Sequence, residues 1–97
     1  MFRQGDVLII RVEKIPETAT QEKACVLAEG EVTGHAHRVK SKWAKMFTAE
    51  DGKRFLHALR TVKVEHEEHG TIVLEPGVYE VRRQREYSPE AIRNVAD

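Results

Sequence analysis

The chain alternates apolar and polar residues with a period of two over most of its length, which is the pattern of β-strands with one buried face. Within residues 61–66, for example, Val62 and Val64 fall on one face of the expected strand and Lys63 on the other. Turn-forming residues separate these stretches about every 8–12 residues. The strongest of these signals is Asp51-Gly52, which predicts a hairpin. The pattern favours many short strands over a helical fold.

The same pattern predicts about seven or eight short strands in a mostly β domain, built as a small barrel or a sandwich. Ser88 and Pro89 suit the first positions of a helix, so we expect a short C-terminal helix over 88–96. We expect a single domain over 1–97. Residues 56–59 are also compatible with a helical turn. The expected strands are 7–12, 24–28, 32–39, 43–48, 54–59, 61–66, 71–74 and 78–81.

The composition limits the class of protein further. With 97 residues, the chain is long enough for one hydrophobic core but not for two. Its 16 basic and 16 acidic residues give a formal net charge of zero, which excludes a disordered polyelectrolyte and a strongly basic DNA-coating protein. Cys25 is the single cysteine, so an intrachain disulfide and a cysteine-ligated zinc site are excluded. The first apolar run, 7–10, is too short for a signal peptide or a membrane helix, so we expect a cytoplasmic location and no membrane partner.

The zero net charge is the sum of two oppositely charged segments. Residues 38–63 hold eight basic and two acidic residues, a net charge of +6, and residues 64–81 hold five acidic and no basic residues, a net charge of −5. These charges form either solvated strand faces or a basic surface for an anionic partner such as nucleic acid. The candidate anion or nucleic-acid contacts are Arg38, Lys40, Lys42, Lys45, Arg82, Arg83 and Arg85.

Four of the five histidines form two close pairs. His35 and His37 are two residues apart, so on a strand their imidazoles point to the same face. His66 and His69 flank two glutamates. On a straight strand these two would point to opposite faces, whereas a bend or a helical turn would bring them together.

Histidines near carboxylates are typical ligands of divalent transition metals, here zinc, iron, nickel or manganese. The predicted metal ligands are His35, His37, His66 and His69. The first three form the expected first set, and His69 is a fourth ligand or a partner that holds an imidazole tautomer. Glu67 or Glu68 could take either of these roles in place of His69. The competing interpretation is that these four histidines are structural or surface residues without a metal.

The chain resembles a group of small, uncharacterised bacterial proteins that share four short segments. In this sequence the segments are 4–7 (QGDV), 33–37 (TGHAH), 66–69 (HEEH) and 84–87 (QREY). The resemblance covers nearly the whole chain and implies no particular activity.

A second resemblance is to the cupins, the double-stranded β-helix family. Residues 34–37 (GHAH) are similar to the first cupin metal motif, and Pro76-Gly77 is similar to the turn of the second. The resemblance implies a double-stranded β-helix with a metal site. The chain lacks the acidic residue of the first motif and the histidine of the second, so His66 or His69 would have to supply the missing ligands.

Three hypotheses for function follow. The first is a small cytoplasmic accessory or regulatory domain that binds a metal or a protein partner through its histidines. The second is a minimal cupin-like metalloenzyme, in which Glu67 or Glu68 acts as the general base. The third is a nucleic-acid-binding module that uses residues 38–63 and 82–85. Because so short a chain forms only shallow pockets, we also expect a homo-oligomer.

Overall fold

The computed structural model describes residues 1–29 and 34–84, and within these ranges the chain forms ten β-strands and no α-helix. The strands are β1 (Phe2–Gln4), β2 (Val7–Val12), β3 (Thr20–Gln21), β4 (Val26–Glu29), β5 (Ala36–Arg38), β6 (Ala44–Thr48), β7 (Arg54–Ala58), β8 (Val62–Val64), β9 (Ile72–Leu74) and β10 (Gly77–Arg83). The predicted mostly β class is confirmed. The helix expected over 88–96 lies outside the described residues, and no helix in the described part is long and apolar enough to cross a membrane.

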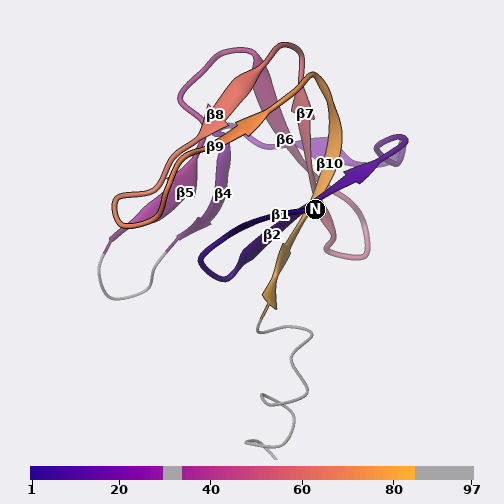
Figure 1. Ribbon diagram of the computed structural model, residues 1–97. Helices are drawn as coiled ribbons and strands as arrows, with labels where there is room; N and C mark the ends of the chain where they lie inside the picture. Colours follow the sequence, from indigo (N-terminus) through magenta and orange to yellow (C-terminus); the bar gives the residue numbers. More distant parts are fainter. Residues whose placement is uncertain (30–33, 85–97) are drawn as a thin grey trace, which may run out of the picture.

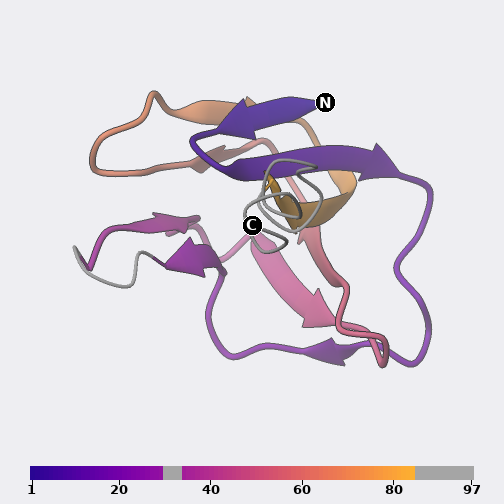
Figure 2. The same cartoon turned by 90° about the horizontal axis from the view of Figure 1, so that it is seen from below.

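The strands form three antiparallel sheets (Figures 1 and 2). The large sheet has six strands in the order β1-β2-β10-β7-β6-β3, and the two small sheets are the pairs β4-β5 and β8-β9. The prediction of a barrel is wrong, because the edge strands β1 and β3 of the large sheet do not pair with each other. The large sheet therefore stays open at both edges within the described residues.

The hydrophobic core lies between one face of the large sheet and the two small sheets. The period-two pattern is confirmed in β8, where Val62 and Val64 are buried and Lys63 is exposed. Burying a Val, Leu or Ile side chain contributes about 1.5–3 kcal/mol, so this shared core is the main stabilising feature of the fold. The core residues are Val7, Ile9, Leu27, Ala28, Val39, Ala44, Met46, Leu56, Ala58, Val62, Val64, Leu74, Tyr79 and Val81.

The hairpin predicted at Asp51-Gly52 connects β6 and β7. Gly52 has a φ of 87° and donates its N–H to the Ala49 carbonyl at 3.0 Å, while the Ala49 N–H donates to the Lys53 carbonyl at 2.8 Å. Glycine occupies this left-handed position without the steric cost that a side chain would bring. Because Arg54–Ala58 is a strand, the helical turn considered for 56–59 is not formed.

Two edge strands were not predicted. Strand β1 pairs with β2 through the partners Gln4 and Val7, so the connection between them is the two-residue turn Gly5-Asp6. Gly5 has a φ of 60°, which suits the first position of such a tight turn. Strand β3 has only two residues and pairs with the end of β6.

A backbone bridge places the two histidine pairs side by side. The Arg38 N–H donates to the Glu65 carbonyl at 3.0 Å, and the Glu65 N–H donates to the Arg38 carbonyl at 2.9 Å. Arg38 directly follows His37, and Glu65 directly precedes His66. The bridge therefore aligns the β5 segment with the end of β8, although the two are far apart in the sequence (Figure 1).

Candidate metal centre

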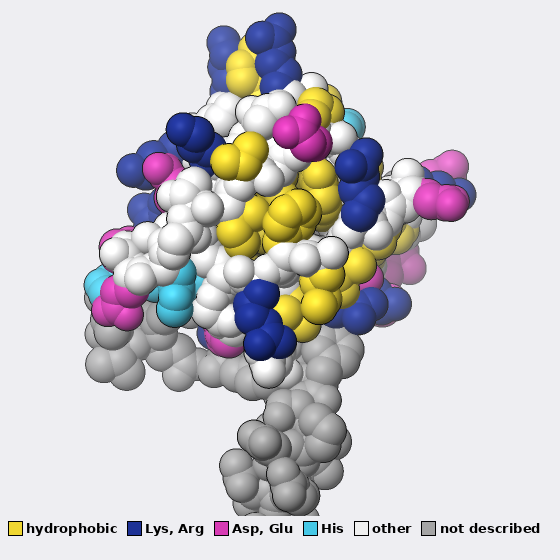
Figure 3. Space-filling model, in the orientation of Figure 1, with side chains coloured by type: hydrophobic (Ala, Val, Ile, Leu, Met, Phe, Trp, Pro, Cys, Tyr) yellow, Lys and Arg dark blue, Asp and Glu magenta, His cyan; other side chains and the backbone are white. Residues whose placement is uncertain are grey.

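The four paired histidines lie together in one cluster. The ring centroid of His66 is 5.7 Å from that of His35, 4.2 Å from that of His37 and 4.6 Å from that of His69. The rings of His37 and His69 stack with their centroids 5.9 Å apart. Figure 3 shows histidine and acidic side chains gathered at one edge of the visible face. His66 is therefore the centre of the cluster.

Two of these histidines and a neighbouring glutamate bring their potential ligand atoms close together. His35, His66 and Glu67 each offer one atom, and these atoms all lie within 4.8 Å of one another. Both histidines are half-buried and the glutamate is exposed, so the group lies at the surface. Among the described residues, no other group of three His, Cys, Asp or Glu side chains converges in this way.

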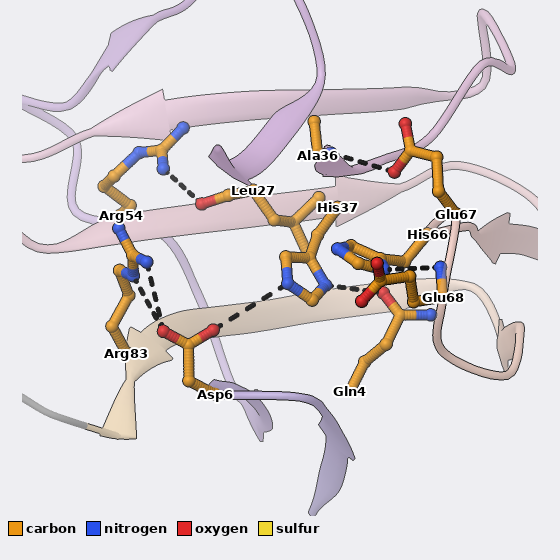
Figure 4. A network of polar contacts seen from close by, with 10 residues as sticks. All are labelled: Gln4, Asp6, Leu27, Ala36, His37, Arg54, His66, Glu67, Glu68 and Arg83. Carbon is orange, nitrogen blue, oxygen red and sulfur yellow. Dashed lines mark hydrogen bonds and ion pairs between the residues drawn. The ribbon is translucent and has the colours of Figure 1, made fainter. Parts of the chain in front are cut away.

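Backbone hydrogen bonds fix the carboxylate of Glu67 in the group. The Ala36 N–H donates to Glu67 Oε2 at 3.0 Å, which ties this side chain to β5 (Figure 4). Hydrogen bonds from the backbone N–H groups of Glu67 itself and of Ala36 lower the pKa of the Glu67 carboxyl below its ordinary value. Glu67 is therefore an anion at neutral pH, as a metal ligand must be.

Glu68 contacts both histidines of the group without joining it. Its Oε1 lies 3.3 Å from His35 Nδ1, a contact that suits a ring whose Nδ1 carries the proton and whose Nε2 presents a lone pair. The backbone N–H of Glu68 donates to His66 Nδ1 at 3.0 Å. In this state the neutral His66 ring therefore carries its proton on Nε2.

His37 is buried behind the group, and Gln4 determines its tautomer. The Gln4 Nε2 amide donates to the carbonyls of Val64 and Gly70, at 2.9 and 2.8 Å. The Gln4 Oε1 can therefore only accept, and it lies 2.8 Å from His37 Nδ1 (Figure 4). His37 Nδ1 must donate this hydrogen bond, which leaves a lone pair on His37 Nε2.

The lone pair of His37 Nε2 faces Asp6 Oδ1 at 3.8 Å. Burial and the nearby His66 lower the pKa of His37 to about 4, although Asp6 acts in the opposite direction. Burial also raises the pKa of Asp6, but the hydrogen bonds and the charge of Arg83 outweigh it and lower that pKa. At neutral pH the pair is therefore a neutral imidazole beside a carboxylate that Arg83 neutralises at 3.0 Å.

His69 occupies the exposed side of the cluster. Its ring lies against Gly5, where an added Cβ would come within 2.7 Å of His69 Nε2. The His69 ring can approach the backbone this closely because Gly5 has no side chain. His37 and His69 belong to the cluster through their ring contacts, but their ligand atoms do not join those of His35, His66 and Glu67.

The predicted anion contacts lie on several different elements of the chain. Arg82 pairs with Glu80 on β10, at 2.7 and 3.0 Å, and Arg83 pairs with Asp6. Lys42 lies over the Trp43 ring, 5.2 Å from its centroid. Arg38 and Lys40 border a small cavity beside His66. Lys45 is exposed on β6, and Arg85 lies outside the described residues.

Gln4 and Asp6 were not predicted as site residues. A glutamine or an aspartate beside a turn is not an unusual residue, so neither attracts notice. The partners of Gln4 and Asp6 are also remote in the sequence. The segment pattern already contained them, because QGDV includes both residues and TGHAH and HEEH include the histidines. The Gln84 N–H also donates to the Asp6 carbonyl at 2.6 Å, so the first and fourth segments meet as well.

The chain is therefore a mostly β domain with open antiparallel sheets and a cluster of histidine and carboxylate side chains at their junction. Residues 3–84 match a family model described as Domain of unknown function (DUF8820), and the chain belongs to this family. No curated protein matches the chain, and neither does any solved structure.

Proposed function

We propose that this protein is a metal-binding β domain in which His35, His66 and Glu67 hold one divalent transition-metal ion. The observation that carries the proposal is the convergence of their three ligand atoms within 4.8 Å. Two imidazoles and one carboxylate form the ligand set of catalytic zinc sites and of non-haem iron(II) sites. We therefore favour zinc and iron(II) over nickel and manganese.

The surroundings of the three ligands support the proposal. Metal-bound histidines usually donate their second ring nitrogen to a carboxylate, and Glu68 lies 3.3 Å from His35 Nδ1 in the position for this. The bond from the Ala36 N–H holds Glu67 toward the same point. Three protein ligands leave at least one coordination position for water or for a further ligand.

We assign the domain an accessory or regulatory role, in the cytoplasm and with partner chains, as the sequence suggests. The cavity beside the ligands measures about 230 Å³, which is smaller than the roughly 300–1,000 Å³ of typical ligand pockets. A metalloenzyme is the alternative, with Glu68 as the base, because Glu67 would serve as a ligand. The open sheet lends no support to a cupin-type barrel for that enzyme.

The direct test is the metal content of the protein purified without a histidine tag. We expect close to one equivalent of zinc or iron, or uptake of one equivalent on titration of the metal-free protein. A ligand at a hundredfold excess over its dissociation constant adds about 2.7 kcal/mol of stability, so thermal denaturation should shift upward by several degrees. The proposal would be refuted if zinc, iron(II), nickel and manganese all gave neither metal uptake nor a shift in the denaturation temperature.

Single substitutions locate the site. His66→Gln and Glu67→Gln should each weaken zinc binding by at least about tenfold, because each removes one ligand. His57→Gln is the matched control, since His57 lies on β7 and is the one histidine outside the two pairs. Equal losses in His57→Gln and His66→Gln would indicate non-specific binding and contradict the assignment.

A further inference from the structure

A small cavity adjoins the proposed metal ligands. It measures about 230 Å³ and lies where β5 meets the end of β8, joined by the Arg38–Glu65 bridge. Two of the proposed ligands, His66 and Glu67, form part of its wall. Figure 4 shows Glu67 reaching to Ala36 beside the His66 ring. A metal held by these residues would therefore lie beside this cavity.

The wall of the same cavity also carries two cations, from Arg38 and Lys40. The Arg38 guanidinium forms a long ion pair with Glu67, and one of its N–H groups has no acceptor in the described part of the chain. Its Nε is buried and has no hydrogen-bond partner among the described residues, and its NH2 group lies 3.9 Å from Glu67 Oε1, beyond hydrogen-bond distance. Lys40 is exposed, and its ammonium forms no ion pair with a carboxylate of the described residues. Both cations can therefore pair with a ligand in the cavity.

The charges around the cavity balance only while the metal is absent. Arg38 and Lys40 contribute two positive charges, and Glu65 and Glu67 contribute two negative ones. A divalent ion at His35, His66 and Glu67 would raise the sum to two positive charges. A bound metal would thus turn a neutral cavity into one that favours an anion.

We propose that this cavity binds a small oxyanion, which completes the coordination of the metal and is held by Arg38 and Lys40. The inference rests on the metal-binding function proposed above. Arginine offers a planar fork of donors that matches carboxylate and phosphate oxygens, and lysine adds a point charge. The small volume selects an anion of a few atoms or the acidic end of a larger molecule.

The test measures anion binding by isothermal titration calorimetry, with the full chain either metal-free or loaded with one equivalent of zinc. Inorganic phosphate and acetate are the two probes, so the arms separate a phosphate site from a carboxylate site. We expect one of the two anions to bind the zinc-loaded protein and neither to bind the metal-free protein. Zinc binding without any binding of phosphate or acetate would overturn this inference while leaving the metal site intact.

Variants show whether the two cations are responsible. Lys40→Met and Arg38→Met should each weaken anion binding by about tenfold, which is the effect of losing one charge-assisted contact. Zinc should still bind Lys40→Met in the absence of added anion, because Lys40 is not one of the three proposed ligands. Lys45→Met removes an exposed lysine of β6 outside the cavity and should leave anion binding unchanged. Unchanged anion binding in both cavity variants would refute the assignment.

Discussion

Gln4 Oε1 accepts a hydrogen bond from His37 Nδ1 at 2.8 Å, and this bond joins the first strand of the large sheet to the buried histidine of the cluster. The same amide donates to the carbonyls of Val64 and Gly70, so one side chain contacts three separate segments. Gln4 is 2% exposed. A buried side chain with all its donors and acceptors used specifies one arrangement of the segments around it.

Replacement of Gln4 by methionine should therefore destabilise the fold. The change keeps the length of the side chain but removes the acceptor of His37 Nδ1 and the donor to two carbonyls, at a cost of about 3 kcal/mol. The free energy of unfolding from urea denaturation measures this directly. Gln21→Met on the exposed strand β3 is the control and should change stability by less than about 0.5 kcal/mol. Similar stabilities of the two variants would contradict the role assigned to Gln4.

The ion pair between Glu22 and Arg54 predicts a pH-dependent stability. Burial raises the pKa of Glu22, but hydrogen bonds from Arg54 and Thr48 and the charge of Arg54 outweigh it, so the folded pKa lies below the ordinary value of 4.5. The stabilisation is therefore fully present above pH 4.5 and is lost as the pH falls through the lowered folded value. Glu22→Gln should cost about 1 kcal/mol at pH 7, where both partners are charged, and clearly less at pH 3.

Urea denaturation of wild type and Glu22→Gln at the two pH values measures that difference. Glu50→Gln serves as the control, because Glu50 is an exposed acid in the turn between β6 and β7. It should change the free energy of unfolding only slightly at either pH. A Glu22→Gln penalty of equal size at pH 7 and pH 3 would show that the ion pair is not its cause.

Cys25 should be an unreactive thiol in the folded protein. Burial raises its pKa to about 11, although hydrogen bonding with the Val39 backbone and the charge of Arg54 act in the opposite direction. The ordinary value is 9.0, so the thiolate fraction at pH 8 falls roughly a hundredfold. Reaction with a disulfide reagent at pH 8 should be slower by about this factor in buffer than in 8 M urea. Equal rates in the two solvents would show that the thiol is exposed.

The strands could be predicted from the sequence because side-chain alternation is a local property. Val62, Lys63 and Val64 show the expected order of buried, exposed and buried residues, and Asp51-Gly52 marks the turn that forms. The arrangement of the sheets could not be predicted in the same way. Whether a sheet closes depends on pairing between distant segments, and the two edge strands β1 and β3 are too short to give a recognisable pattern.

The candidate site shows the same limit. The spacing of His35 and His37 predicted neighbouring imidazoles, but their approach to His66 depends on the bridge between Arg38 and Glu65, which no local pattern reveals. The acceptors of the Gln4 amide are backbone carbonyls, which carry no side-chain signal at all. The residues that hold the cluster together are therefore harder to find from sequence than the histidines themselves.

The last prediction concerns the hydrogen bond from the Glu68 N–H to His66 Nδ1, at 3.0 Å. A neutral imidazole has one proton and one lone pair. If a metal binds His66 Nε2, the ring proton moves to Nδ1, which can then no longer accept. If it binds Nδ1, that lone pair is used by the metal. In both cases zinc binding at the proposed site must break the bond from the Glu68 N–H.

Two-dimensional amide NMR of the zinc-free and zinc-loaded protein observes this change. The Glu68 amide proton should move upfield on loading, in proportion to the zinc added up to one equivalent, because it loses its acceptor. The amide of Gly52, in the β6–β7 hairpin and bonded to the Ala49 carbonyl, is the internal reference and should not move. In Glu67→Gln the Glu68 shift should require far more zinc, since one ligand is missing. Zinc binding without a change in the chemical shift of the Glu68 amide proton would exclude His66 as a ligand.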